Sequence, residues 1–379
     1  MYRMTLQKII DRLWTQVKAM KHSQKHISFA VFSLILFLSY SATAGGLPLE
    51  TVMKTGHADS IHALCFSRDG RFVVTASNDR TAKLWETRTG REVRTFKGHS
   101  SGVNSVDSSP DGKFIVTGSS DGSAKLWDAV TGREVRAFGS SDSYQGFMSF
   151  DSYLASVNGV SFSPDGNYVV IGTNDGMKLW DVRTGRILRS FSGSMVLSAS
   201  FSPDSRYILA AGTDRTARLL NVSTGKEVRV FTPPSNLRPG LKPGSDSGYM
   251  YSAVFSPDGK YVVTGGYGAA TLWNAQTGLT IRTFQGHSDM IRSLGLSLDG
   301  RYLVTGSEDK TAKVWDVATG RIIFALRDST HAVRAVGLSP DGKCVVTGNE
   351  YGTVRAYDVS TGQVIWVSGK GESNKVYCV

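Results

Sequence analysis

The sequence predicts an all-β protein, and three observations lead to this fold class. The chain of 379 residues is 40% hydrophobic, so it can bury a large core, and its 41 glycines outnumber its ten prolines. Short runs rich in Val, Thr, Tyr and Phe are separated by Asp-Gly and Thr-Gly pairs, which is typical of β-hairpins. The third observation is self-similarity along the chain, which indicates how the hairpins are organised.

The first segment, residues 1–44, has the features of a secretory signal peptide, with an alternative start at Met20. Six basic residues precede a short apolar run, and an Ala-Thr-Ala cleavage motif ends at Ala44. We therefore expect cleavage after Ala44 and a periplasmic or extracellular mature protein, residues 45–379. The alternative is an uncleaved signal anchor, and only through it would this chain be expected to meet a membrane.

Charge and cysteine content argue against several classes of function. The formal net charge is +11, but six of the basic residues belong to the leader, so the remaining excess does not predict nucleic-acid binding. Cys65, Cys344 and Cys378 are too few, and odd in number, for a disulfide framework. Zinc-protease, phosphate-loop and dinucleotide motifs are missing from the sequence, so we expect no metal and no cofactor.

After the leader, one unit of about forty residues recurs along the chain. Three copies are nearly complete and begin at Gly56, Gly98 and Gly286; in each, a His lies 22 residues before an Asp and 28 before a Trp. Each copy holds four β-rich runs, such as VNSVDSS, KFIVTGSS, SAKLWDA and EVRAF in the second. A single four-stranded sheet cannot bury both faces, so the seven units predict a seven-bladed β-propeller. The four degenerate copies end at Trp180, Leu220, Trp273 and Tyr357.

This pattern resembles the WD40 repeat (WD-repeat) family of β-propellers from Leu49 to about Val367, and its SPDG-rich copies are similar to bacterial, here exported, members. In that family a His, a Ser or Thr, an Asp and a Trp form a hydrogen-bonded structural tetrad in each blade. The resemblance implies three complete tetrads: His57, Ser77, Asp79 and Trp85; His99, Ser119, Asp121 and Trp127; and His287, Ser307, Asp309 and Trp315.

The segment GHSSG, residues 98–102, also matches the G-x-S-x-G pattern of a hydrolase nucleophile. That chemistry needs a strand, a sharp turn and a helix around the serine. The repeat places Ser100 in a connection between two strands instead. We therefore predict no catalytic residue and expect that the chain is not an enzyme.

Four of the seven tetrads are incomplete. One interpretation is relaxed selection in a ring already held by packing, and the alternative is that the departures serve function. The replaced positions are Tyr153 in the third unit, Ser192 and Leu220 in the fourth, Gly268 in the fifth, and Tyr351 and Tyr357 in the seventh.

Two insertions lengthen the connections that lead into the third and fifth units, residues 139–159 and 232–250. In the family that the chain resembles, such connections share one end of the ring, the end that most often binds partners. The alternative is that their apolar residues fold back and cap the ring. The binding hypothesis names Tyr144, Phe147, Met148, Phe150, Tyr153, Leu237, Arg238, Lys242, Tyr249 and Met250.

The outermost strand of five units repeats an arginine. These residues predict a basic belt that either meets an anionic surface or, as charged edge strands do, prevents edge-to-edge aggregation. The belt consists of Arg94, Arg136, Arg189, Arg229 and Arg282.

Closure of the ring has two candidate strands, because residues 49–53 and 363–367 both have the pattern of an outer strand. The second follows a tight turn at Thr361-Gly362, and its loop-closure cost is small, so we expect it to complete the last blade.

These observations together predict a monomeric, non-catalytic platform that binds a protein or peptide through preorganised loops. The rival hypothesis is a propeller enzyme, or a small-molecule or metal site, at the mouth of the central channel. After the leader, His62 and His331 are the histidines that the tetrads leave for such a site.

Overall fold

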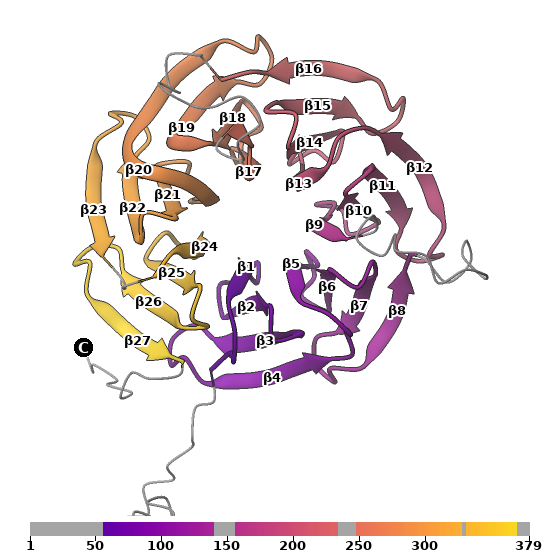
Figure 1. The fold of residues 1–379 in the computed structure, drawn as a ribbon, viewed down its shortest axis with the longest axis horizontal. Helices are drawn as coiled ribbons and strands as arrows, with labels where there is room; N and C mark the ends of the chain where they lie inside the picture. The colour runs from indigo at the N-terminus through magenta and orange to yellow at the C-terminus, as the bar shows by residue number, and fades with distance from the viewer. Residues whose placement is uncertain (1–55, 140–155, 234–247, 328–330, 370–379) are drawn as a thin grey trace, which may run out of the picture. The chain divides into compact units, whose positions relative to one another are not determined.

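The part of the chain that the structure describes folds into β-strands arranged as a ring of sheets (Figure 1). The structure, a computed structural model, describes residues 56–139, 156–233, 248–327 and 331–369. Within these ranges the chain forms 27 strands and no α-helix, which confirms the all-β class. No helix in this part of the chain is long and apolar enough to cross a bilayer.

Seven antiparallel units, or blades, follow one another along the chain, and the strands of each run in the order a, b, c, d from the channel outward. Blades 1 and 2 comprise β1 (Ile61–Phe66), β2 (Phe72–Ser77), β3 (Thr81–Glu86), β4 (Glu92–Lys97), β5 (Val103–Ser108), β6 (Phe114–Ser119), β7 (Ala124–Asp128) and β8 (Glu134–Phe138). Blades 3 and 4 comprise β9 (Val157–Phe162), β10 (Tyr168–Thr173), β11 (Gly176–Asp181), β12 (Ile187–Ser192), β13 (Val196–Phe201), β14 (Tyr207–Gly212), β15 (Ala217–Asn221) and β16 (Glu227–Phe231). Blades 5 to 7 comprise β17 (Ser252–Phe255), β18 (Tyr261–Gly265), β19 (Tyr267–Asn274), β20 (Thr280–Leu296), β21 (Tyr302–Ser307), β22 (Thr311–Asp316), β23 (Ile322–Arg327), β24 (Val333–Leu338), β25 (Cys344–Asn349), β26 (Val354–Asp358) and β27 (Val364–Ser368).

The turn between strands a and b is built in the same way in all seven blades. In blade 2, the Ser109 hydroxyl donates to Asp111 Oδ1 at 2.7 Å and accepts the amide of Phe114 at 2.9 Å. Gly112 completes the turn at φ +69°, a conformation that L side chains rarely adopt. The S-x-D-G segments therefore start the first hairpin of six blades, as their sequence predicts, and blade 4 has Ser205 at φ +59° in place of the glycine.

Blades 5 and 6 differ from the predicted separate sheets, because β20 is continuous. Its first half is strand d of blade 5 and its second half is strand a of blade 6, so seven strands form one sheet. At the junction, the amide of Ile291 donates to the carbonyl of Gly266 at 3.0 Å, and Tyr267 pairs with Met290. The b–c turn of blade 5 has Gly268 at the position predicted for the tetrad Asp. The residues on either side of it, Tyr267 and Ala269, pair with Met290 and Gln285 of β20.

The core of the ring lies at the seven junctions between blades. Each innermost strand packs on the next, β1 on β5 and so on round to β24 on β1. Seven separate apolar clusters fill the junctions, and each holds buried residues from two neighbouring blades. At the junction of blades 7 and 1, for example, Ile61, Trp85, Val346 and Trp366 are all fully buried. The ring therefore buries both faces of each sheet, whereas an isolated blade would leave both faces exposed to water.

Strand β27 completes blade 7 by pairing with β26, which confirms the expected C-terminal closure. The competing segment, residues 49–53, lies outside the described residues. Gly56 lies against Gly369 just beyond β27: a Cβ on Gly56 would be 2.3 Å from the Gly369 Cα. Blades 7 and 1 therefore meet where the two ends of the described chain come together.

The arginines of the outer strands join each blade to the next, a role that neither interpretation of the belt included. Arg94 Nη1 donates to the carbonyl of Thr131, in the c–d turn of the following blade, at 2.9 Å. Phe324 holds the same position in blade 6 and lies against Gly362, and Trp366 holds it in blade 7. The other four arginine contacts are Arg136 with Thr184, Arg189 with Thr224, Arg229 with Thr277 and Arg282 with Thr319.

Candidate interaction surface

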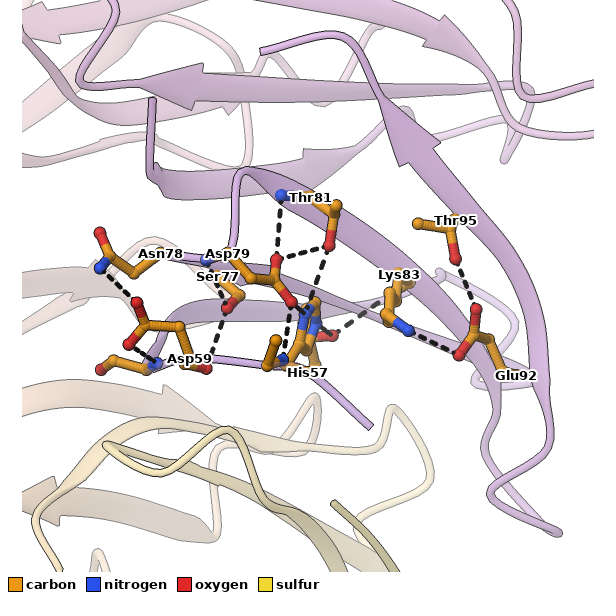
Figure 2. Close-up of polar contacts among 12 residues, drawn as sticks. His57, Asp59, Ser77, Asn78, Asp79, Thr81, Lys83, Glu92 and Thr95 are labelled. Atoms are coloured by element: carbon orange, nitrogen blue, oxygen red, sulfur yellow. Dashed lines mark hydrogen bonds and ion pairs between the residues drawn. The ribbon is translucent and has the colours of Figure 1, made fainter. Parts of the chain in front are cut away.

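The three complete tetrads have almost the same geometry. In blade 1, His57 Nδ1 lies 2.8 Å from Asp79 Oδ2, and Figure 2 shows the His57 ring facing this carboxylate. His57 Nε2 lies 2.7 Å from the hydroxyl of Thr75, which also accepts the indole N–H of Trp85 at 2.8 Å. A neutral imidazole with its proton on Nδ1 satisfies every group in this chain of hydrogen bonds.

The hydroxyl that joins His to Trp belongs to a threonine, so the assignment of Ser77, Ser119 and Ser307 to the tetrads was wrong. The joining residues are Thr75, Thr117 and Thr305, two positions earlier on strand b. In blade 1, Ser77 Oγ donates to the carbonyl of Asp59 at 3.0 Å and accepts the amide of Asp79 at 3.1 Å (Figure 2). Ser77 thus holds the backbone of the b–c turn, and its hydroxyl takes no part in the hydrogen bonds that join His57 to Trp85.

The pKa values of the tetrad groups agree with a charged Asp beside a neutral His. Burial lowers the pKa of His57, although the bond to Asp79 opposes this shift. Burial alone would raise the pKa of Asp79, but the bonds from His57 and from the Thr81 hydroxyl hold it well below its usual range. The carboxylate also accepts the amide of Ala58 at 2.9 Å, so its charge organises the turn.

Blades 3 and 4 lack the joining threonine. Blade 3 has Ile171 at that position, and the indole nitrogen of Trp180 is buried without a hydrogen-bond partner among the described residues. Blade 4 has Ala210 and Leu220 in place of Thr and Trp, and Arg218 binds Asp214 instead of a His, with 2.7 Å between Nη2 and Oδ2. Blade 3 therefore lacks the hydrogen bond between strand b and the Trp, and blade 4 has an ion pair between Arg218 and Asp214 in place of the His–Asp pair.

Ser100 lies in the connection between β4 and β5, as the repeat predicts. Its backbone amide donates to Asp121 Oδ2 at 3.0 Å, so the residue belongs to the turn that the tetrad organises. The connection enters a strand, and a nucleophile of the hydrolase type would need a helix there.

The d–a connections and the b–c turns share one end of the ring, here called the tetrad end, because His57 from the first binds Asp79 from the second. Strand a has a β-bulge at this end in every blade except the fifth, and the bulged residues of blades 1, 6 and 7 are His62, Arg292 and Arg334. A bulge changes the direction of the side chain on the extra residue.

Side chains of blades 5 to 7 form a connected polar and aromatic group at the tetrad end. The guanidinium of Arg292 lies 3.9 Å from the ring centre of Tyr251, and the ring of Tyr249 lies 6.1 Å from that of Tyr251. Arg292 Nε donates to Glu308 Oε1 at 2.7 Å, and a nitrogen of Arg334 lies 3.7 Å from the same oxygen. These contacts hold both guanidinium groups in fixed positions.

The group continues into blade 7. Arg334 Nη2 lies 3.2 Å from Glu350 Oε1, and the rings of His331 and Tyr351 are 3.7 Å apart. Tyr351 is 60% exposed and stands in the turn position that the tetrad Asp has elsewhere. We call the whole set the tyrosine–arginine arc: Tyr249, Tyr251, Arg292, Glu308, His331, Arg334, Glu350 and Tyr351.

His62 lies near the arc in blade 1. Burial, together with the charges of Arg334 and Arg292, lowers its pKa to about 4, although Asp59 opposes the shift. The ring is therefore neutral at physiological pH. In the described part of the chain, no three His, Cys, Asp or Glu side chains are grouped as metal ligands would be.

The predicted binding residues have three different outcomes. Tyr249 belongs to the arc. Met250 was a wrong assignment: it is fully buried in the apolar cluster between blades 4 and 5, because it holds the inward position that Ile61 has in blade 1. The remaining eight lie outside the described residues: Tyr144, Phe147, Met148, Phe150, Tyr153, Leu237, Arg238 and Lys242.

The sequence repeat matches a known family model seven times. The model is described as "WD domain, G-beta repeat", and it matches residues 49–86, 90–128, 147–181, 185–221, 241–274, 278–316 and 320–358. The chain belongs to the WD40 repeat family. The matches that begin at residues 90, 185, 278 and 320 each start just before an outer strand and continue through the next a, b and c strands. The last match ends at residue 358, so β27 falls outside all seven.

Curated relatives of this WD40 chain include nuclear distribution proteins of fungi. Nuclear distribution protein PAC1 of Arthroderma otae is 30% identical over 68% of this chain and 59% of its own length. Nuclear distribution protein nudF of Emericella nidulans is 26% identical over 80% of this chain and 72% of its own length. The PAC1 protein of Coccidioides posadasii is 27% identical, and this chain spans only 41% of its length.

These relatives correct the expected location. The prediction of a periplasmic or extracellular protein of a bacterial exported type was wrong, because the chain matches nuclear distribution proteins of fungi. The predicted leader, residues 1–44, lies outside the described residues and stays a prediction.

Proposed function

We propose that this chain is a non-catalytic platform that binds a protein or peptide partner at the tetrad end of the ring, through the tyrosine–arginine arc. WD40 repeats serve as protein-interaction scaffolds, and the chain has seven of them. The observation that carries the proposal is the arc itself, where two arginines and three tyrosines lie together. Tyrosine and arginine are enriched where protein interfaces bury most of their surface.

The ion pairs of the arc support a binding role more than a stabilising one. Arg292 and Arg334 have side chains that are each 27% exposed, and Glu350 is 45% exposed, so water screens these pairs. Their geometry is fixed before a partner arrives, which lowers the ordering cost of association. The three complete tetrads, by contrast, are buried and have all their hydrogen bonds made inside the blade.

The named role of the relatives does not carry over directly. Those proteins are called nuclear distribution proteins, and this chain spans 41% and 59% of the first two of them. We propose only the shared element, a WD40 ring that contacts another protein.

The test is site-specific cross-linking in the cells that produce the protein. A photoreactive residue at Tyr351, 60% exposed in the arc, is compared with one at Val130, 74% exposed in a c–d turn at the opposite end. We expect the Tyr351 probe to capture one or a few discrete partners and the Val130 probe to capture none of them. The double change Tyr251→Ala and Arg292→Gln should remove those products, and capture that survives this change would contradict the proposal.

A further inference from the structure

Three b–c turns at the tetrad end have a basic residue in a conformation that favours glycine. Arg80, Arg215 and Lys310 each have φ of +70°, inside the left-handed region. Gly122 and Gly352 hold the equivalent position in blades 2 and 7, at φ +83° and +80°. A side chain with a Cβ is disfavoured in this region, whereas glycine enters it freely.

The five turns have the same hydrogen bond, so the backbone does not require a basic side chain. The amide of Arg80 donates to the carbonyl of Ser77 at 3.2 Å, and the amide of Gly122 donates to the carbonyl of Ser119 at the same distance. Lys310 and Gly352 repeat the bond at 3.2 Å, and Arg215 at 3.4 Å. Glycine therefore makes the same turn without backbone strain. Blades 1, 4 and 6 have a basic residue at this position despite the strain that it causes.

The side chains of these three residues are available to a partner. Arg80 and Lys310 are exposed, and Arg215 is half-buried. Among the described residues, no ion pair within 4.0 Å is recorded for any of them, whereas Arg292 and Arg334 are paired with Glu308 and Glu350.

Arg215 and Lys310 stand next to the arc, and Arg80 lies in the b–c turn of blade 1, at the same end of the ring. A Cβ on Gly248 would lie 2.5 Å from Arg215 Nε, so this arginine lies along the backbone that leads to Tyr249. Lys310 follows Glu308 by two residues in the same turn, and Arg80 follows Asn78, whose amide binds Asp59. Basic side chains thus stand in b–c turns at the tetrad end of blades 1, 4 and 6.

We propose that Arg80, Arg215 and Lys310 bind an acidic segment, rich in aspartate or glutamate, of the protein that docks on the arc. This inference rests on the proposed function and specifies the chemistry of its partner. Without residues 1–44 the chain still has 37 Lys and Arg against 31 Asp and Glu, and this net charge of +6 has the matching sign. Carboxylates at the same end, among them Asp59, Asp289, Glu308 and Glu350, lie between the basic residues and would repel a continuous polyanion such as DNA. A short acidic segment that reaches single basic side chains fits this pattern better.

The experiment measures binding of a fluorescent glutamate-rich peptide by anisotropy, with the glutamine counterpart of the peptide as reference. The triple variant Arg80→Gly, Arg215→Gly and Lys310→Gly should bind the acidic peptide about tenfold more weakly. Its thermal unfolding midpoint should stay the same or rise, because glycine relieves the backbone strain. Weaker binding together with undiminished stability is a result that a purely structural role for these residues cannot produce.

Two controls fix the interpretation. Changing Arg71, Arg133 and Arg321 to glutamine removes the same charge from the opposite end of the ring and should leave the affinity within about twofold. The change Gly122→Arg adds a basic residue at the equivalent turn position of blade 2 and should tighten binding while lowering the unfolding midpoint.

Three results would overturn the inference: unchanged binding by the triple glycine variant, an equal loss in the control triple, or tighter binding of duplex DNA or anionic vesicles than of the peptide. If Tyr351 cross-linking still captures partners in any of these cases, the proposed function survives and only the acidic chemistry fails. If cross-linking fails as well, both fail.

Discussion

At the scale of single residues, one threonine hydroxyl holds each complete tetrad together. Thr75 accepts the Trp85 indole and binds His57, so its loss leaves two buried groups without partners. We expect Thr75→Val to lower the free energy of unfolding by about 1–3 kcal/mol, measured by urea denaturation. Ser77→Ala is the control and should cost less, because Ser77 binds only turn backbone. An equal or larger loss for Ser77→Ala would contradict this assignment.

Residue spacing alone could not distinguish these two hydroxyls. Thr75 and Ser77 are two positions apart on β2, and the period-2 geometry of a strand places both on the same face. A signal was present in other units, because Ile171 and Ala210 replace the threonine in blades whose tetrads are broken. His, Asp and Trp were predictable, since the repeat gives each a constant offset.

A second residue, Asp107, makes stability depend on pH. Its carboxylate accepts the amide of Phe162, across the junction of blades 2 and 3, at 2.8 Å. Burial raises the pKa of Asp107 to about 6, above the ordinary value of the unfolded chain. The folded state therefore binds a proton that the unfolded state does not, and this group adds stability as the pH falls from about 7 toward 4.

Asp107→Asn should remove that contribution. Urea unfolding at pH 5 and pH 7 is expected to show wild type gaining stability, relative to the variant, at the lower pH. The tetrad aspartates have the opposite sign, because their pKa values are lowered, and their contribution is lost only below about pH 4. Parallel pH dependence in the two proteins would contradict the role of Asp107.

At the scale of elements, the junction of blades 7 and 1 depends on β27. Trp366 Nε1 donates to the carbonyl of Thr87 at 2.6 Å, and the ring covers Gly90 in the c–d turn of blade 1. A Cβ on Gly90 would lie 2.4 Å from the Trp366 ring. Where five other junctions have an arginine in this position, the closing junction has an indole.

Two glycine substitutions measure how much the contact between Trp366 and Gly90 stabilises the closing junction. Gly90→Ala and Gly112→Ala both place alanine at positive φ, +64° and +69°, but a Cβ on Gly112 meets nothing within 4 Å. Gly112→Ala should cost only the backbone strain of about 1–2 kcal/mol. Gly90→Ala should cost about 1–3 kcal/mol more in urea denaturation, because Trp366 must move. Equal losses would show that the indole does not hold the closing junction.

The strand pattern of each blade was predictable, but the join between blades 5 and 6 was not. The hairpins follow from S-x-D-G and T-G turns that are local in sequence. The continuity of β20 depends on a backbone bond between Gly266 and Ile291, whose residues lie in different repeats. Met250 was misjudged for a related reason, since an insertion boundary does not show which residue begins strand a and turns inward.

At the scale of the whole molecule, the ring could be predicted because every blade repeats the same hydrophobic pattern. The arc could not, because it is assembled from blades 5, 6 and 7, and its two bulged arginines, Arg292 and Arg334, are 42 positions apart in the sequence. Arg292 and Arg334 come together only when blades 6 and 7 pack. Aligning the units on strand a places His62, Arg292 and Arg334 at one position, together with Asn104, Asn158 and Leu197, but it does not show the contacts with Glu308 and Tyr251.

The central claim is that the buried tetrads hold the ring while the arc binds the partner, and comparing two variants tests it most directly. Thr75→Val and the double change Tyr251→Ala with Arg292→Gln are each measured for urea stability and for Tyr351 cross-linking to partner. We predict that the first loses stability and keeps the cross-link, whereas the second keeps stability and loses the cross-link. The reverse pattern, or loss of both properties in both variants, would contradict the account.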